Sequence, residues 1–300
     1  MQPGGVTIVG PFEGEIMTAA SARLAAASLA LAFPAAAAAQ DAPPPDASAE
    51  TQRVTVPTDG PTEEEGSRRW RYRVTLGPRV GGGFPGNDRM QLLPFFGLSR
   101  ARGDEPYRFG GVGEGASIPL LRGKQVEVGP MFRFEGRRDR DDIGGGVNRV
   151  GRTVELGGFA QYWPRETIRL RADVRKGIGG HKGWVGSLAA DRVWRDGDRW
   201  LVSLGPRAVI SDGRRHDAFF GVDEATSLRT GLPRFDAKGG VESLGAQSRV
   251  VYAFDERWGV QGFVTYARLI GDAGSSPLIR RVDSQDQVTA GLGLTYTFSR

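Results

Sequence analysis

The sequence predicts an all-β protein, a transmembrane antiparallel β-barrel of about twelve strands, with a range of about ten to fourteen. Three observations support this fold class. Residues 287–298 alternate between apolar side chains and small or polar ones, and similar alternation recurs from Trp70 onward. An export signal precedes the alternating region. Successive strand side chains point to opposite faces, so each such strand offers one face to lipid and the other to a lumen.

The N-terminal region reads as a secretory signal. Residues 17–40 have the sequence MTAASARLAAASLALAFPAAAAAQ. Arg23 supplies the positive charge, residues 24–33 form the apolar core, and residues 37–39 form a small-residue cleavage site. The core is too short to cross a bilayer as a helix. We therefore assign residues 1–39 to an N-terminal extension and a signal peptide that starts at Met17, with Met1 and Met17 both open as the true start.

The mature chain divides into a tail and a barrel. Residues 40–67 are rich in proline, alanine and acidic residues. Such a segment buries too little apolar surface to offset its chain entropy, so we expect a disordered periplasmic tail. Residues 68–300 form the predicted barrel.

Twelve stretches have the pattern of strands. Their bounds are 70–80, 89–99, 106–120, 124–135, 152–163, 166–175, 182–194, 198–210, 216–222, 239–254, 256–267 and 286–298. Turn-forming residues separate most of them, and longer connections occur at 137–150, 223–237 and 270–285. Short and long connections that alternate are typical of outer-membrane barrels, whose periplasmic turns are short.

The apolar rows are expected to face lipid. A soluble barrel of this size would enclose a lumen too wide for side chains to fill. Aromatic residues near the strand ends suit an interfacial girdle. They are Trp70, Tyr72, Trp163, Trp194, Trp200, Trp258, Tyr296 and Phe298. The predicted location is the outer membrane of a Gram-negative bacterium, with outer-membrane lipid as the immediate partner.

A row of arginines shares the face opposite lipid. The predicted lumen-facing basic residues are Arg71, Arg73, Arg133, Arg169, Arg171, Arg175 and Arg207. The acidic residues on that face are Glu127, Glu135, Glu155 and Asp173. Because buried charge must be paired or hydrated, two interpretations stay open. One is an internal salt-bridge lattice, and the other is an anion-tolerant channel for small solutes.

The chain offers little catalytic or metal-binding chemistry. It has no cysteine and two histidines, His181 and His216. Neither histidine belongs to a cluster with metal-ligand spacing, so no catalytic, metal or cofactor site is predicted. Ser211, Asp212 and His216 have the residue types of a hydrolytic triad, which keeps an outer-membrane hydrolase as a second alternative. The formal charge of +5 is spread among the strands, so no nucleic acid is expected.

Several segments together resemble a known family. They are VGPMFRFEGRRDRDD (128–142), VELGGFAQYW (154–163), FFGV (219–222), YARLIGDAGSSPLI (266–279) and the terminal GLGLTYTF. In order and spacing they resemble the MipA/OmpV family of outer-membrane proteins, the MltA-interacting proteins. The resemblance implies a barrel that is not an enzyme. It also implies a scaffold for envelope proteins, with a lytic transglycosylase and a murein synthase as partners.

Overall fold

The computed structural model describes residues 8–10, 69–87 and 89–300. The predicted signal peptide and periplasmic tail therefore lie outside the described residues, as does the extension apart from β1 (Ile8–Gly10). The other strands are β2 (Trp70–Gly81), β3 (Gln91–Arg102), β4 (Ala116–Ser117), β5 (Leu121–Arg122), β6 (Val126–Glu135), β7 (Thr153–Arg165), β8 (Ile168–Gly179), β9 (Trp184–Asp196), β10 (Trp200–Ser211), β11 (Gly240–Ala253), β12 (Trp258–Leu269) and β13 (Asp286–Ser299). The helices are α2 (Gly213–Phe220), α3 (Glu224–Thr230), α4 (Gly271–Ser275) and α5 (Pro277–Arg281).

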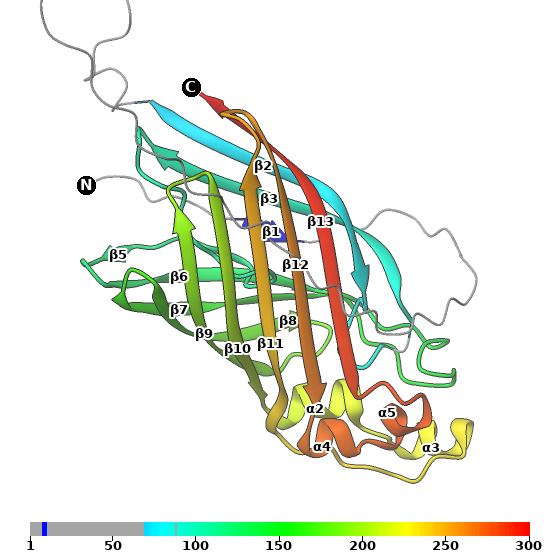
Figure 1. The fold of residues 1–300 in the computed structure, drawn as a ribbon. Coiled ribbons are helices and arrows are strands. Elements are labelled where there is room, and N and C mark those ends of the chain that lie inside the picture. Colours follow the sequence, from blue (N-terminus) through cyan, green and yellow to red (C-terminus); the bar gives the residue numbers. More distant parts are fainter. Residues whose placement is uncertain (1–7, 11–68, 88) are drawn as a thin grey trace, which may run out of the picture. The chain divides into compact units, whose positions relative to one another are not determined.

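In the described part of the chain, 13 strands form one curled antiparallel sheet (Figure 1). Its hydrogen-bonded order is β1-β3-β2-β13-β12-β11-β10-β9-β8-β7-β6-β4, and β5 also pairs with β6. From β6 to β13 the neighbours are consecutive in sequence, as are β2 and β3. The other pairings are β13 with β2, β1 with β3, and β4 with β6. The predicted all-β antiparallel barrel is confirmed, and its last strand, β13, pairs with both β12 and β2.

The wall of the barrel is apolar outside and charged inside. In β8, Leu170 and Val174 are 43% and 56% exposed, whereas Arg169 and Arg175 are 0% and 1% exposed. A protein folded in water would place these residues the other way round. The period of two forces this arrangement, because shifting the register by one residue would put every arginine outside.

The predicted strand at 216–222 is wrong, because the structure has a helix there. Asp212 accepts a hydrogen bond from the backbone N–H of Arg215 at 3.1 Å and so caps the N-terminus of α2. Buried residues of α2 fall at His216, Phe219 and Phe220, which is helical spacing. The short apolar run Phe219–Phe220 fits a strand or a helix equally well. The N-cap at Asp212 decides in favour of the helix.

The predicted strand at 106–120 is also wrong over most of its length. Gly113 and Gly115 have φ values of 77° and 80°, which breaks an extended strand. Residues 103–115 leave the wall and run inside the curled sheet; we call this segment the strap. Only β4 and β5, which follow the strap, pair with β6.

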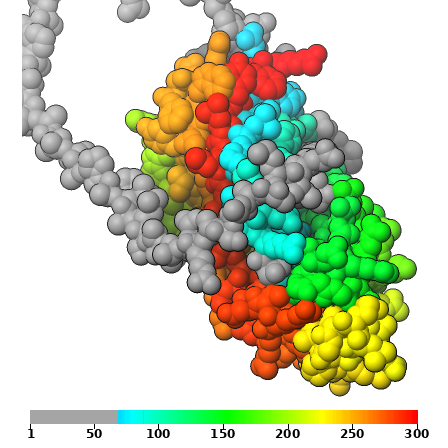
Figure 2. Space-filling model, turned by 90° about the vertical axis from the view of Figure 1, so that its right-hand side faces the viewer, coloured from blue at the N-terminus to red at the C-terminus, as the bar shows by residue number. Residues whose placement is uncertain are grey.

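Long connections and helices gather at one end of the sheet and form a cap. The cap comprises residues 136–152, 212–239 and 270–285, which lie together at the lower end of Figure 2. Its hydrophobic core consists of Phe84, Ile143, Val147, Val150, Phe219, Phe220, Val222, Ala237, Leu269, Ala273, Leu278 and Ile279. Within the described ranges, no helix is long and apolar enough to span a membrane. The short turns 166–167, 197–199 and 254–257 lie at the opposite end, with the C-terminus.

Candidate functional site

The strap is held inside the sheet by polar side chains that reach its backbone. Gln247 of β11 both accepts from the N–H of Val112 and donates to its carbonyl, each at 2.9 Å. Arg249 donates to the carbonyl of Gly110, and Arg195 donates to the carbonyl of Tyr107 at 3.0 Å. Backbone groups that left the sheet at 103–115 thus recover partners from the wall, as buried amides require.

Glu114 at the end of the strap is the centre of a buried ion-pair cluster. Arg169 of β8 contacts the Glu114 carboxylate with both terminal nitrogens, one of them at 3.0 Å. The same guanidinium lies 2.7 Å from Asp191 of β9. Arg207 of β10 reaches the other Asp191 oxygen at 2.6 Å. Two carboxylates and two guanidiniums therefore join the strap to three successive strands.

The charge state of Glu114 follows from this cluster. Burial by itself would raise the pKa of the carboxyl group, but the charges of Arg169 and Arg171, with the Arg169 hydrogen bonds, outweigh it. The net effect holds the pKa of Glu114 well below its ordinary value. Glu114 is consequently a carboxylate at neutral pH, and the strap is anchored by a full negative charge.

A second set of charged groups continues toward the cap. Arg175 of β8 donates to Glu155 of β7 at 2.8 Å and also contacts Asp173. Glu155 in turn lies 3.1 Å from the Nε2 atom of His181. Arg171 bridges the two sets, because it lies 3.7 Å from Glu114 and 3.9 Å from Asp173. The charged interior is therefore one continuous lattice.

Arg215 of α2 joins the cap to this lattice. Its guanidinium lies 2.8 Å from Glu242, 3.3 Å from Glu135 and 3.3 Å from Glu155. Burial alone would lower the pKa of Arg215, but the nearby charges of Glu242 and Glu135 raise it above its ordinary value. One arginine thus contacts three buried carboxylates, from β6, β7 and β11, and these contacts fix α2 over the interior.

A cavity opens at the end that carries the short turns. It has a volume of about 950 Å³, and Arg71, Arg73, Tyr107 and Asp198 line its inner part. The guanidinium carbons of Arg71 and Arg73 lie 5.1 Å and 4.1 Å from the Tyr107 ring centroid. Arg71 also pairs with Asp198 at 2.9 Å. Asp104 and Tyr107 of the strap therefore contribute to the lining of this cavity.

The structure brings six of the seven predicted arginines into contact with the strap or the lattice. Arg71 and Arg73 meet the strap at Tyr107, and Arg169, Arg171, Arg175 and Arg207 belong to the lattice. Arg133 is the most loosely held, with a half-exposed side chain 3.8 Å from Glu135.

Sequence reasoning missed Glu114, Asp191, Glu242 and Arg215. The surplus of arginine over acid on the inner face was the signal that further carboxylates had to be found. Glu114 lies in the glycine-rich strap, Asp191 and Glu242 lie in β9 and β11, and Arg215 lies in the helix α2, where the sequence predicts a strand nearby.

Ser211, Asp212 and His216 do not form a hydrolytic triad. The Ser211 hydroxyl donates to Glu242 at 2.7 Å, and the Asp212 carboxylate caps α2. Neither ring nitrogen of buried His216 has a hydrogen-bond partner in the described chain. A nucleophile activated by a base needs a hydrogen bond between the two. Ser211 and Asp212 make their hydrogen bonds elsewhere, and the His216 ring bonds to neither of them. Among the described residues, no group of three histidines or carboxylates is arranged to hold a metal ion.

The wall is apolar outside and charged inside, and the strap lies within it. These features define a transmembrane β-barrel with an occupied lumen. Residues 74–298 match the protein family described as MltA-interacting protein MipA. The chain belongs to this family, which confirms the resemblance seen in its segments. No curated protein matches the chain.

Proposed function

We propose that this chain is a non-enzymatic barrel of the bacterial outer membrane and a scaffold for murein-processing proteins. The observation that carries the proposal is the family match over residues 74–298. The family description names an interaction with MltA, a lytic transglycosylase. The interior supports the proposal, because its polar groups are used to hold the strap and the cap and are not arranged around a substrate.

The contact face for a murein enzyme is the end with the short turns. Murein lies on the periplasmic side of the outer membrane, and short turns face that side in barrels of this kind. Exposed residues such as Glu256 and Arg257 of the turn between β11 and β12 lie beside the cavity at this end. The cap forms the opposite face and would be directed away from murein.

Affinity capture tests both the function and the face. We expect the tagged full chain, extracted from membranes, to retain a lytic transglycosylase and a murein synthase above the level of an unrelated barrel. Glu256→Ala with Arg257→Ala should reduce their recovery several-fold. The matched control, Glu224→Ala with Arg229→Ala on α3, should leave it unchanged. Recovery no higher than that of the unrelated barrel would contradict the scaffold. Recovery that falls only in the α3 variant would contradict the assigned face.

The ion-paired interior favours a closed barrel over the anion-tolerant channel. Glu114, Asp173, Glu155 and Asp191 offset the arginines that would otherwise attract anions. The strap, which Arg169 of β8 and Gln247 of β11 hold inside the sheet, also occupies part of the interior. We therefore infer that the arginines act as structural anchors in the resting protein. The hydrolase alternative receives no support from the contacts of Ser211, Asp212 and His216.

A further inference from the structure

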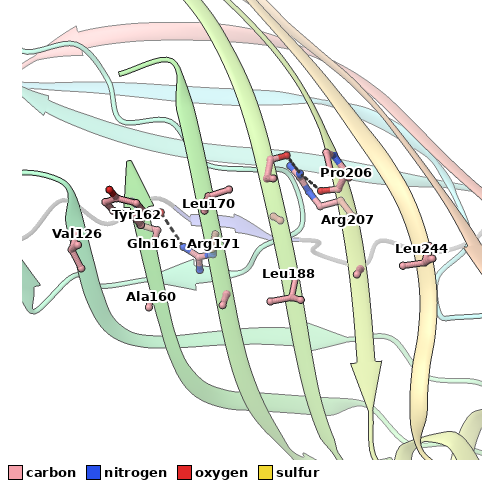
Figure 3. A pocket seen from close by; sticks show the side chains of 14 residues that line it. Val126, Ala160, Gln161, Tyr162, Leu170, Arg171, Leu188, Pro206, Arg207 and Leu244 are labelled. Atoms are coloured by element: carbon pink, nitrogen blue, oxygen red, sulfur yellow. Dashed lines mark hydrogen bonds between the residues drawn. The ribbon is translucent and has the colours of Figure 1, made fainter. Parts of the chain in front are cut away.

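The outer wall of the barrel carries an apolar groove that crosses six strands, from β6 to β11. Its floor is made of small outward-facing residues, Ala160, Ala172, Ala190 and Ala208. Leu170 of β8, Leu188 of β9 and Leu244 of β11 stand beside them (Figure 3). The groove has a volume of about 570 Å³, within the roughly 300–1,000 Å³ of ordinary small-molecule sites. Register explains the hollow, since Ala160 pairs with Ala172 and leaves two small side chains side by side.

Two exposed arginines flank the end of this groove nearest the short turns. Ile168 of β8 pairs with Arg165 of β7 on one side and with Arg192 of β9 on the other. Directly opposed residues share a face, so both arginines lie on the outer wall. Two interstrand spacings separate their backbones by roughly 10 Å. The next outward row, toward the middle of the wall, is Tyr162, Leu170 and Ala190, which already line the groove.

These arginines differ from those of the interior because they have no counter-charge. In the described part of the chain, neither Arg165 nor Arg192 makes an ion pair or a hydrogen bond through its side chain. The guanidinium carbon of Arg192 lies 5.7 Å from the ring centroid of Trp194. Tryptophan and tyrosine mark the headgroup level of a bilayer, so Trp194 and Tyr162 put the two arginines at that level. An anion from the membrane is the complement that the site lacks.

We propose that Arg165 and Arg192 bind the phosphate of an anionic glycerophospholipid whose acyl chain lies in the alanine-floored groove. The two guanidiniums approach the phosphate from either side of Ile168, and charge-assisted hydrogen bonds to phosphate are the strong kind. The small residues let the acyl chain lie close to the backbone, as they do where helices meet in membranes. A second copy of the chain fits less well, because it would bring two unpaired arginine pairs together and bury them. This inference rests on the membrane location but not on any murein enzyme as partner.

Lipid binding to the purified full-length protein in a zwitterionic detergent tests the proposal. The probes are dioleoyl phosphatidylglycerol and dioleoyl phosphatidylcholine, with bound lipid counted by native mass spectrometry. We expect the wild type to prefer the anionic lipid. Arg165→Gln with Arg192→Gln should weaken binding of that lipid about tenfold or more, at about 1 kcal/mol per basic residue. The matched control is Lys182→Gln with Arg214→Gln, which removes two exposed charges at the cap end and should have no effect.

A second variant tests the groove itself. Ala172→Phe with Ala190→Phe fills the floor from the outside and should reduce binding of both lipids without changing the thermal unfolding of the protein. Unchanged binding of the anionic lipid in the arginine variant would overturn the proposal. Glycerol phosphate that competes as well as the intact lipid would overturn it too, because a free phosphate would then be the ligand. A dimer that disappears in the phenylalanine variant would assign the groove to a second copy instead.

Discussion

At the scale of single residues, the interior depends on a few charges that each serve several partners. Arg215 contacts carboxylates of three strands, and Glu114 contacts two guanidiniums. Buried pairs of this kind contribute little net stability compared with apolar packing, but removing one member leaves the other charge stranded. The lattice therefore specifies one position for the strap and one for α2.

Replacing Arg215 should strongly destabilise the protein. Arg215→Met leaves Glu135, Glu155 and Glu242 buried without their shared cation. Loss of one partner from a buried pair costs about 3–5 kcal/mol. Urea unfolding of the barrel in lipid vesicles, followed by tryptophan fluorescence, measures this cost. The neighbouring residue Arg214 is exposed, and Arg214→Met should change the free energy of unfolding by less than about 0.5 kcal/mol. Equal effects of the two substitutions would show that Arg215 does not anchor the cap.

The anchor at Glu114 should depend on pH in a definite direction. The folded-state pKa of Glu114 lies below its ordinary value of 4.5. The stability that the Glu114 carboxylate contributes is therefore fully present when the pH is above the ordinary pKa. It is lost progressively as the pH falls toward the folded-state pKa. Glu114→Gln should lower the free energy of unfolding by about 1.5–3 kcal/mol at pH 7. The gap between the free energies of unfolding of the wild type and the variant should narrow below about pH 4. Urea midpoints at pH 7 and pH 3.5 measure the gap, with exposed Glu224→Gln as the control. A gap that widens in acid would contradict the assigned sign.

At the scale of elements, α2 shows how a helix is fixed over the mouth of a barrel. Arg215 holds its first turn from the interior. Arg138, buried in the cap, donates to the carbonyls of Ala218 at 2.8 Å and Phe219 at 2.5 Å, at the other end of the helix. A cation at the C-terminus of a helix complements the partial negative charge there. Burial lowers the pKa of Arg138 to about 10, with Asp142 acting in the opposite direction, so it remains a cation at neutral pH.

Substitution of Arg138 should loosen α2 without opening the wall. Arg138→Lys keeps the charge but loses the fork that reaches two carbonyls at once. We expect faster hydrogen exchange across residues 212–239 by about tenfold or more, since charged hydrogen bonds contribute about 1.5–3 kcal/mol. Exchange in β8 should not change. Arg137 is its half-exposed neighbour, and Arg137→Lys serves as the control. Faster exchange in both variants would mean that the carbonyl contacts of Arg138 are not what holds the helix.

The elements also show where sequence reasoning succeeded and failed. Alternation identified β8 and β13 because a lipid-facing row and a charged row must each keep a period of two along a whole strand. It failed at 216–222, where seven residues are too few to distinguish periods of 2 and 3.6. It failed again at 106–120, because Gly113 and Gly115 redirect a segment whose alternation is otherwise strand-like. The arginine rows were visible in the sequence, but the position of Glu114 depends on tertiary structure.

At the scale of the whole molecule, we infer that the strap and the cap close the barrel at rest. Tyr107 of the strap lines the cavity at the short-turn end, and Arg138 and Arg215 fix the cap at the other end. The wall by itself would enclose a space lined by Arg169, Arg171 and Arg207. Whether ions pass should therefore depend on the strap and not on the wall.

Shortening the strap should convert the barrel into an anion-selective pore. We expect planar-bilayer recordings of the wild type to show little or no conductance. Replacing residues 106–115 with a short glycine–serine linker removes Glu114 and the backbone that blocks the interior. The remaining arginines should then raise the local anion concentration and favour chloride over potassium. The control replaces residues 224–230 of the cap with a linker of matched length. Cation preference in the strap variant, or no conductance, would contradict the assigned role of the strap.

The inverted wall also has a calorimetric consequence. The heat-capacity change of unfolding arises mainly from apolar surface that becomes exposed to water. In the described part of the chain the largest buried apolar cluster is the one around Phe219 and Ile279 in the cap, whereas wall residues such as Leu170, Val174 and Leu292 face outward. Unfolding that leaves the chain associated with lipid would hydrate the cap core and little of the wall. Its heat-capacity change would then resemble that of a much smaller soluble domain, and its stability curve would be correspondingly flat with temperature.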